Sequence, residues 1–140
     1  MNDTPVELLL VDDEEGFVSV LSKRLHRRNI NVTPALSGAE AIERFRNQRF
    51  DLVILDLKME FMDGLEVLKV LKAMNPEVPV IMITGHGALE EVQKGIDFGA
   101  LVCLPKPYDF DELVAMIREV SLANKEPQCP FAPFIPIGFG

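Results

Sequence analysis

Four short apolar runs along the chain each end in, or just before, a side chain that can bind or react with an anion or a metal. The runs are residues 6–11, 52–55, 78–83 and 101–104. Each is rich in Val, Ile and Leu without polar alternation, which is typical of a strand buried on both faces of a parallel sheet. The side chains at their ends are Asp12 and Asp13, Asp56, Thr84 and Lys106. Ligands of open parallel sheets bind outside the carboxyl ends of the strands, so these five side chains are expected to converge there.

The segments between these runs carry helix signals. Residues 14–28 hold an apolar helical stripe and end in a basic turn, which suits the negative end of the helix dipole. Ser37–Glu40 forms a capping-box pattern at the start of the next helix. Further helices are predicted at about 65–74, at about 88–98 and after Asp109.

One more strand is predicted at residues 31–36, between the first two helices. Pro34 lacks the N–H that a central strand needs, which places this strand at a sheet edge. Strands and helices therefore alternate five times, and right-handed crossovers put helices on both faces of the sheet. The predicted fold class is α/β: a flavodoxin-like (βα)5 doubly wound sheet of five parallel strands in the order 2-1-3-4-5.

Length and charge limit the function classes. A chain of 140 residues with 48% hydrophobic content can form one domain with one core. The net charge of −8 argues against direct nucleic-acid binding, which requires neutralisation of phosphates. The sequence shows neither a signal peptide nor an apolar run of membrane-spanning length, and its two cysteines form no disulfide framework. A cytoplasmic protein that does not enter membranes is expected.

The C-terminal segment has a different composition from the rest. Prolines recur at every third position from Pro127 to Pro136, which is the period of a polyproline II helix. We therefore expect a domain over residues 1–124 and an extended or disordered Pro/Phe-rich tail over 125–140. Three phenylalanines in that tail favour docking on a protein surface, either its own domain or a second copy. A homodimer is one expected outcome.

Four motifs together resemble a known family. They are Val11–Glu14, Asp56–Met59 with Met62–Gly64, Ile83–Gly87 and Leu104–Pro107, and they occur in order at the ends of predicted elements. Over residues 5–123 the chain resembles the receiver domain of bacterial two-component response regulators, the chemotaxis-regulator-like family. The expected face for contacts between subunits is then the fourth helix, fifth strand and last helix.

The resemblance implies a phosphorelay. A sensor histidine kinase or phosphotransfer protein would pass a phosphoryl group to Asp56, and the changed surface would signal to an unknown downstream protein. The chain would not be an enzyme beyond Mg²⁺-dependent self-phosphorylation and autodephosphorylation. Mg²⁺ accepts one or two carboxylates together with phosphate oxygens and water. Its expected ligands are Asp12, Asp13, Asp56 and the backbone carbonyl of Lys58.

The resemblance assigns Thr84 and Lys106 to the oxygens of the phosphoryl group, with the Lys106–Pro107 bond cis. Two further residues, Lys58 and His86, flank the path of attacking water and are expected to set the lifetime of the aspartyl phosphate. His86 can equally be an exposed loop histidine.

One position departs from the family pattern. Cys103 stands where an aromatic ring usually swings inward on phosphorylation, and we expect a small buried thiol there. The atypical switch leaves an alternative function open, a phosphorylation-independent protein-binding module of the same fold.

Overall fold

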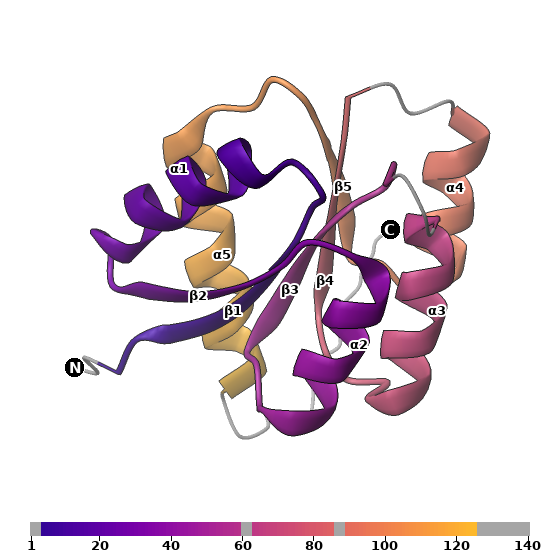
Figure 1. The fold of residues 1–140 in the computed structure, drawn as a ribbon, viewed down its shortest axis with the longest axis horizontal. Coiled ribbons are helices and arrows are strands. Elements are labelled where there is room, and N and C mark those ends of the chain that lie inside the picture. The colour runs from indigo at the N-terminus through magenta and orange to yellow at the C-terminus, as the bar shows by residue number, and fades with distance from the viewer. Residues whose placement is uncertain (1–3, 60–62, 86–88, 126–140) are drawn as a thin grey trace.

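Five parallel strands form one sheet in the order β2-β1-β3-β4-β5 (Figure 1), which confirms the predicted fold class. The computed structural model describes residues 4–59, 63–85 and 89–125, with side chains through residue 122. The strands are β1 (Val6–Val11), β2 (Ile30–Ala35), β3 (Leu52–Asp56), β4 (Val80–Thr84) and β5 (Val102–Pro105). The helices are α1 (Glu15–His26), α2 (Gly38–Asn47), α3 (Gly64–Met74), α4 (Leu89–Asp97) and α5 (Phe110–Lys125).

Helices cover both faces of the sheet, with α1 and α5 on one side and α2, α3 and α4 on the other (Figure 1). Successive residues of β1 serve opposite cores. Leu8 and Leu10 pack with residues of α1 and α5, whereas Leu9 and Val11 pack with residues of α2 and α3. This double burial explains why the strand sequences lack polar alternation.

The two edge strands differ from the central ones. Pro34 pairs in register with Leu10 of β1 and lies on the outermost strand, as its missing N–H predicts. At the other edge, β5 pairs only with β4, and its residues Val102, Cys103 and Leu104 are only partly buried. The prediction of a strand buried on both faces, with a buried thiol at Cys103, is therefore wrong for β5. An edge strand has one neighbour, so solvent reaches its side chains.

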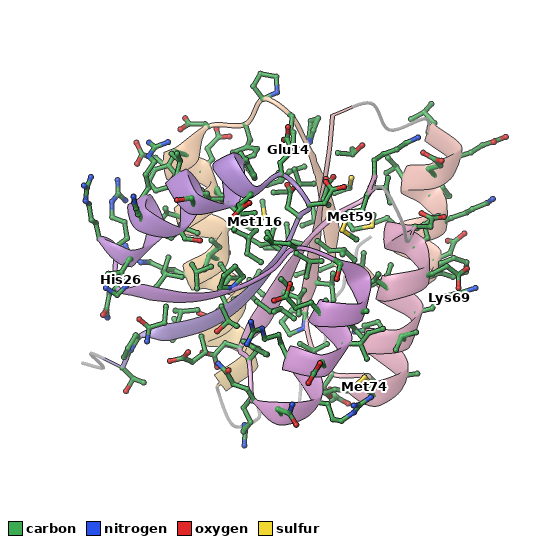
Figure 2. All side chains as sticks on the ribbon, in the orientation of Figure 1. Glu14, His26, Met59, Lys69, Met74 and Met116 are labelled. Carbon is green, nitrogen blue, oxygen red and sulfur yellow. The ribbon has the colours of Figure 1, made fainter. Side chains whose placement is uncertain are left out.

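Local hydrogen bonds set the helix ends. The α1 helix ends at His26, two residues earlier than predicted, because Arg28 N–H turns to the carbonyl of Leu25 at 2.8 Å. Asn29 then adopts a left-handed φ of 66°, which asparagine tolerates better than most residues. His26 points away from the sheet at this end (Figure 2), as expected for a solvated side chain.

The predicted capping box is present. The Ser37 hydroxyl accepts from Glu40 N–H at 3.1 Å, and the Glu40 carboxylate accepts from Leu36 N–H at 2.9 Å, one residue before the expected donor. Two predicted limits move by one or two residues. Strand β4 begins at Val80 rather than Val78, after Pro79, whose carbonyl accepts from Val53 N–H at 3.0 Å. Helix α5 continues through Lys125, which the prediction places in the 125–140 tail, and residues 126–140 of that tail lie outside the described residues.

Helix α4 is the least buried helix of the fold. Only Gly95 of its nine residues is buried, and a Cβ there would collide with the side chain of Met82 on β4. The helix therefore touches the sheet closely at one point. Across the described ranges 4–59, 63–85 and 89–125, no helix has the length and hydropathy that a bilayer crossing needs.

Candidate phosphoryl-acceptor site

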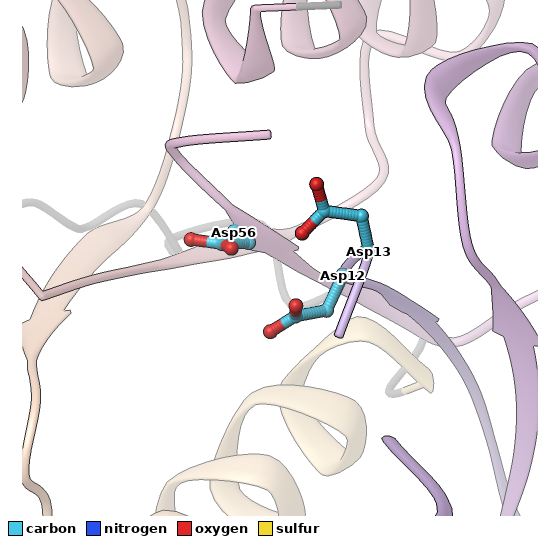
Figure 3. Close-up of side chains that lie close together, drawn as sticks. All are labelled: Asp12, Asp13 and Asp56. Carbon is cyan, nitrogen blue, oxygen red and sulfur yellow. The ribbon is translucent and has the colours of Figure 1, made fainter. Parts of the chain in front are cut away.

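Three carboxylates meet at the carboxyl edge of the sheet. Oxygen atoms of Asp12, Asp13 and Asp56 all lie within 4.8 Å of one another (Figure 3). Asp12 follows β1 and Asp56 ends β3, and these neighbouring strands are in register at Val11 and Leu55. The strand pairing thus brings together the carboxylates that the sequence predicts for this site.

Two of these carboxylates are deeply buried. Asp12 is 2% exposed and Asp56 is 7% exposed, whereas Asp13 faces solvent. The Asp12 carboxylate accepts from Glu14 N–H at 2.9 Å, and the Asp56 carboxylate accepts from Lys58 N–H at 3.3 Å. Each buried carboxylate is therefore fixed by the backbone two residues further along.

The site concentrates negative charge. Burial and, to a lesser extent, the negative charge of Asp12 together raise the pKa of Asp56 to about 6, against the opposing effect of Lys106. Burial also raises the pKa of Asp12. A bound cation would relieve this repulsion. Three carboxylates offer the hard oxygen donors that Mg²⁺ prefers, so the donor set fits this ion.

Lys106 lies beside the acidic cluster. Its Nζ is 3.9 Å from Oδ2 of Asp12 and 5.0 Å from the centroid of the Phe17 ring. Both contacts hold the ammonium at the sheet edge, by charge and by the ring quadrupole. The Lys106–Pro107 peptide bond is cis, as the resemblance implies. Tyr108 also lies within electrostatic reach of Asp12, and burial raises the pKa of its phenol.

Thr84 ends β4 beside these groups. Its side chain is 4% exposed, and its hydroxyl oxygen is buried without a hydrogen-bond partner among the described residues. A buried hydroxyl without a partner is costly and uncommon in folded proteins. The hydroxyl is therefore free to donate to a group that enters the site.

The start of α3 packs directly against the end of β3. A Cβ on Gly64 would lie 2.5 Å from the backbone oxygen of Asp56 and 2.6 Å from that of Leu57. Gly64 N–H donates to Leu57 O at 3.2 Å, and Asp63 caps the helix by accepting from Leu65 N–H at 3.2 Å. Only glycine permits this approach, which fixes the backbone around Asp56.

Of the remaining predicted residues, the structure describes Lys58 and Cys103. The Lys58 side chain extends to α4, with its Nζ 3.7 Å from Oε1 of Glu91. Cys103 is a free thiol whose pKa is raised by partial burial. His86 lies outside the described residues. The sequence did not identify Phe17, Gly64 or Glu91 as site residues. Phe17 belonged to the apolar stripe of a helix, and nothing in the stripe shows that its ring meets Lys106.

Comparisons with known proteins agree with this geometry. The family model described as "Response regulator receiver domain" matches residues 8–118. The chain is 39% identical over 119 residues to the transcriptional regulatory protein ZraR of Escherichia coli K12, which covers 85% of this chain and 27% of that protein. It is 33% identical over 129 residues to the response regulator MprA of a Mycobacterium species, which covers 92% of this chain and 56% of MprA. The chain thus spans about a quarter of ZraR and about half of MprA.

Among solved structures, the CheY-like receiver domain protein of Methanospirillum hungatei superposes with a TM-score of 0.83 at 26% identity, covering 86% of this chain and 97% of that one. The matched residues contain Asp12, Asp13, Asp56, Thr84 and Lys106, the side chains that meet at the sheet edge. The chain belongs to the response regulator receiver domain family.

Proposed function

We propose that this domain accepts a phosphoryl group on Asp56 from a sensor histidine kinase or a phosphotransfer protein, in a Mg²⁺-dependent reaction. The observation that carries the proposal is the meeting of Asp12, Asp13 and Asp56 within 4.8 Å beside a cation and an unpartnered hydroxyl. Structural carboxylates are seldom buried together, because their repulsion destabilises the fold. Binding of a divalent cation, which offsets this repulsion, would explain the arrangement.

The transfer moves one phosphoryl group between two nucleophiles. An oxygen of Asp56 forms the new bond to phosphorus as the N–P bond of a phosphohistidine breaks, and the histidine nitrogen keeps that bonding pair. The phosphoryl group is later removed by hydrolysis. Water forms a bond to phosphorus, the bond to Asp56 breaks, and the carboxylate and inorganic phosphate are released. The chain performs no chemistry on other substrates in this proposal.

The residues of the site have distinct roles. Asp12, Asp13, Asp56 and the backbone carbonyl of Lys58 would hold Mg²⁺. When bound, the ion would screen the repulsion between the carboxylate and the incoming phosphoryl group. Lys106 is placed to pair with one phosphoryl oxygen, and the Thr84 hydroxyl is available to donate to another. These interactions stabilise the charge that builds up on the transferred group.

Phosphorylation of Asp56 would be signalled to a partner by a change in the surface of the domain. A cysteine at position 103 supplies no large ring that could reorient, so we assign the signal to Thr84 and to the loosely attached α4. The name of ZraR describes transcriptional regulation, and by analogy this domain serves as the input module for a downstream protein or second copy. We propose no direct contact with nucleic acid, and a cytoplasmic location.

A small-phosphodonor experiment tests the proposal. The wild-type protein is incubated with acetyl phosphate, with and without Mg²⁺, and its intact mass is measured. We expect one added phosphoryl group only with Mg²⁺, none in Asp56→Asn, and a large loss of rate in Asp13→Ala. Full labelling of Asp56→Asn, or labelling that ignores Mg²⁺, would contradict the proposal and favour a phosphorylation-independent binding module.

A further inference from the structure

Lys58 connects the acceptor residue to helix α4. Its backbone N–H donates to the Asp56 carboxylate at 3.3 Å, which keeps its Cα next to the site. Its side chain turns away, and its ammonium lies 3.7 Å from Oε1 of Glu91 in the first turn of α4. One residue therefore touches the acceptor through its backbone and α4 through its side chain.

The ion pair is weak enough to exchange. The Lys58 side chain is 60% exposed and the Glu91 side chain 39% exposed, and pairs this open to water contribute little to stability. Lysine also carries its charge on a flexible four-carbon stem that can redirect without moving the backbone. The ammonium can thus leave Glu91 at low cost when a stronger anion lies within its reach.

A phosphoryl group on Asp56 is that stronger anion. It adds charge and oxygen acceptors two residues from Lys58, and its several oxygens can accept from Lys58 as well as from Lys106. Helix α4 is also poorly anchored, since Gly95 is its only buried residue. The Lys58–Glu91 pair is one of the contacts at the first turn of this helix, so its loss leaves that turn more weakly attached.

We propose that Glu91 is a positioning residue that holds the Lys58 ammonium on α4 and yields it to the phosphoryl group on Asp56. This inference rests on the proposed function. The exchange does two things at once. It places a cation in the path of the water whose oxygen would bond to phosphorus as the Asp56–phosphorus bond breaks, and it releases the start of α4.

The test uses the full chain and four variants: Glu91→Gln, Lys58→Met, the double variant, and Glu90→Gln. Glu90 is the matched control, because it lies in the same first turn and is exposed, with no ion pair to a cation found in the described part of the chain. Each protein is labelled with acetyl phosphate and Mg²⁺, the donor is removed, and the loss of the phosphoryl group is followed by mass.

We expect Glu91→Gln to slow this loss roughly two- to fivefold, the range for release of one modest ion pair. The effect should vanish in the Lys58→Met background, and Glu90→Gln should decay as wild type does. A Glu91→Gln effect that persists without Lys58, or that Glu90→Gln reproduces, overturns the proposal. A merely structural role for Glu91 would not depend on the charge at residue 58.

A second measurement needs no phosphoryl group. Amide chemical shifts across α4 (Leu89–Asp97) are compared in the unlabelled proteins. We expect Glu91→Gln, Lys58→Met and the double variant to produce the same changes, because each removes the same contact, and additive changes would contradict the ion pair. If the wild type takes no phosphoryl group, the proposed function and the kinetic role of Glu91 both fail, while the shifts still decide whether Lys58 holds α4.

Discussion

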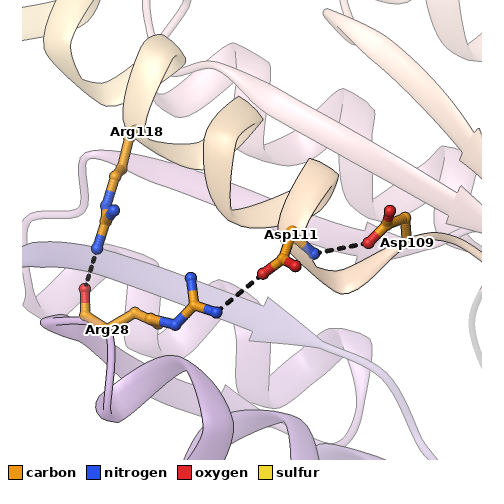
Figure 4. A network of polar contacts seen from close by, with 4 residues as sticks. All are labelled: Arg28, Asp109, Asp111 and Arg118. Carbon is orange, nitrogen blue, oxygen red and sulfur yellow. Dashed lines mark hydrogen bonds and ion pairs between the residues drawn. The ribbon is translucent and has the colours of Figure 1, made fainter.

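The guanidinium carbon of Arg24 lies 3.8 Å from the centroid of the Phe110 ring, so the end of α1 is stacked on the start of α5. Arg28 approaches the same ring at 5.2 Å and forms an ion pair with Asp111 at 2.8 Å (Figure 4). Arg118 of α5 donates to the backbone carbonyl of Arg28 at 2.7 Å. The basic last turn of α1 therefore does more than complement a helix dipole, because it joins the two helices on this face of the sheet.

Loss of the Phe110 ring should loosen this junction. Phe110→Ala is expected to lower the free energy of unfolding by about 1–3 kcal/mol, from lost apolar burial and two lost cation–π contacts. Phe110→Leu should cost about 0.5–1 kcal/mol, since it keeps apolar bulk and loses the ring quadrupole. Urea denaturation measures both. Arg27→Ala is the control, since Arg27 makes no ring contact within the described residues. If Arg27→Ala lowered the free energy of unfolding as much as Phe110→Ala does, the stacking argument would be contradicted.

Asp56 should make the metal-free protein less stable at neutral pH. Its pKa rises from 3.8 unfolded to about 6 folded, so the folded state binds more protons between these values. Stability must then fall as the pH rises through this window, and the full cost is present above it. Asp56→Asn should be more stable than wild type by about 1–3 kcal/mol at pH 7.5 in chelator, and this advantage should be much smaller at pH 4 and vanish below both pKa values.

Denaturant unfolding at both pH values checks this expectation. Glu119→Gln, which removes an exposed carboxylate on α5, is measured beside it as the control for loss of a carboxylate outside the site. Added Mg²⁺ should raise the stability of the wild type more than that of Asp56→Asn. A difference that is the same at pH 4 and pH 7.5 would show that charge repulsion is not its cause.

Thr84→Val should separate stability from function. Valine keeps the shape of threonine and removes a buried hydroxyl that has no partner in the described structure, so the unlabelled protein should gain about 0.5–1.5 kcal/mol. Phosphoryl uptake from acetyl phosphate should slow by about tenfold or more, which is the worth of one hydrogen bond to a charged group. Thr84→Ser keeps the hydroxyl and should retain most of the rate. A Thr84→Val protein labelled as fast as wild type would remove this hydroxyl from the mechanism.

Gly64→Ala should damage the acceptor backbone. Its Cβ would meet two backbone oxygens, of Asp56 and Leu57, that cannot move aside without shifting β3. We expect a loss of about 1–3 kcal/mol in the free energy of unfolding, together with slower labelling. Gly16→Ala is a matched control, because no atom lies within 4 Å of the added Cβ and alanine favours the helix, so this variant should be neutral or more stable.

Cys103→Tyr should restore a ring at the sheet edge. Because Cys103 is only partly buried on β5, the larger side chain can extend into solvent, and the cost should stay below about 1 kcal/mol. The chemical-shift change on addition of Mg²⁺ and beryllofluoride should be larger around β5 in this variant than in Cys103→Ala. Equal changes in the two variants would show that the ring takes no part in the switch.

The sequence predicts those features that depend on strand order and misses those that depend on side-chain direction. Asp12 and Asp56 could be placed together because parallel strands end at a common edge, and Pro34 marked the outer strand. The contacts of Lys106 with Phe17 and of Lys58 with Glu91 depend on how a helix packs against the sheet and on which rotamer a long side chain adopts. The spacing of residues in the sequence specifies neither the helix packing nor the rotamer. The partial exposure of β5 was missed because its apolar run was read as burial on both faces, although the predicted strand order already places this strand at an edge of the sheet.

The positions of the site residues also bear on how the protein is made. Asp12 directly follows the first strand, Asp56 and Thr84 end strands in the middle of the chain, and Lys106 follows the last strand. A chain emerging from the ribosome has its acidic residues long before it has the lysine that offsets their charge. The site is thus a late product of synthesis, and a truncated or half-made chain would carry the carboxylates without the ammonium. The five side chains can meet only when the last strand has joined the sheet.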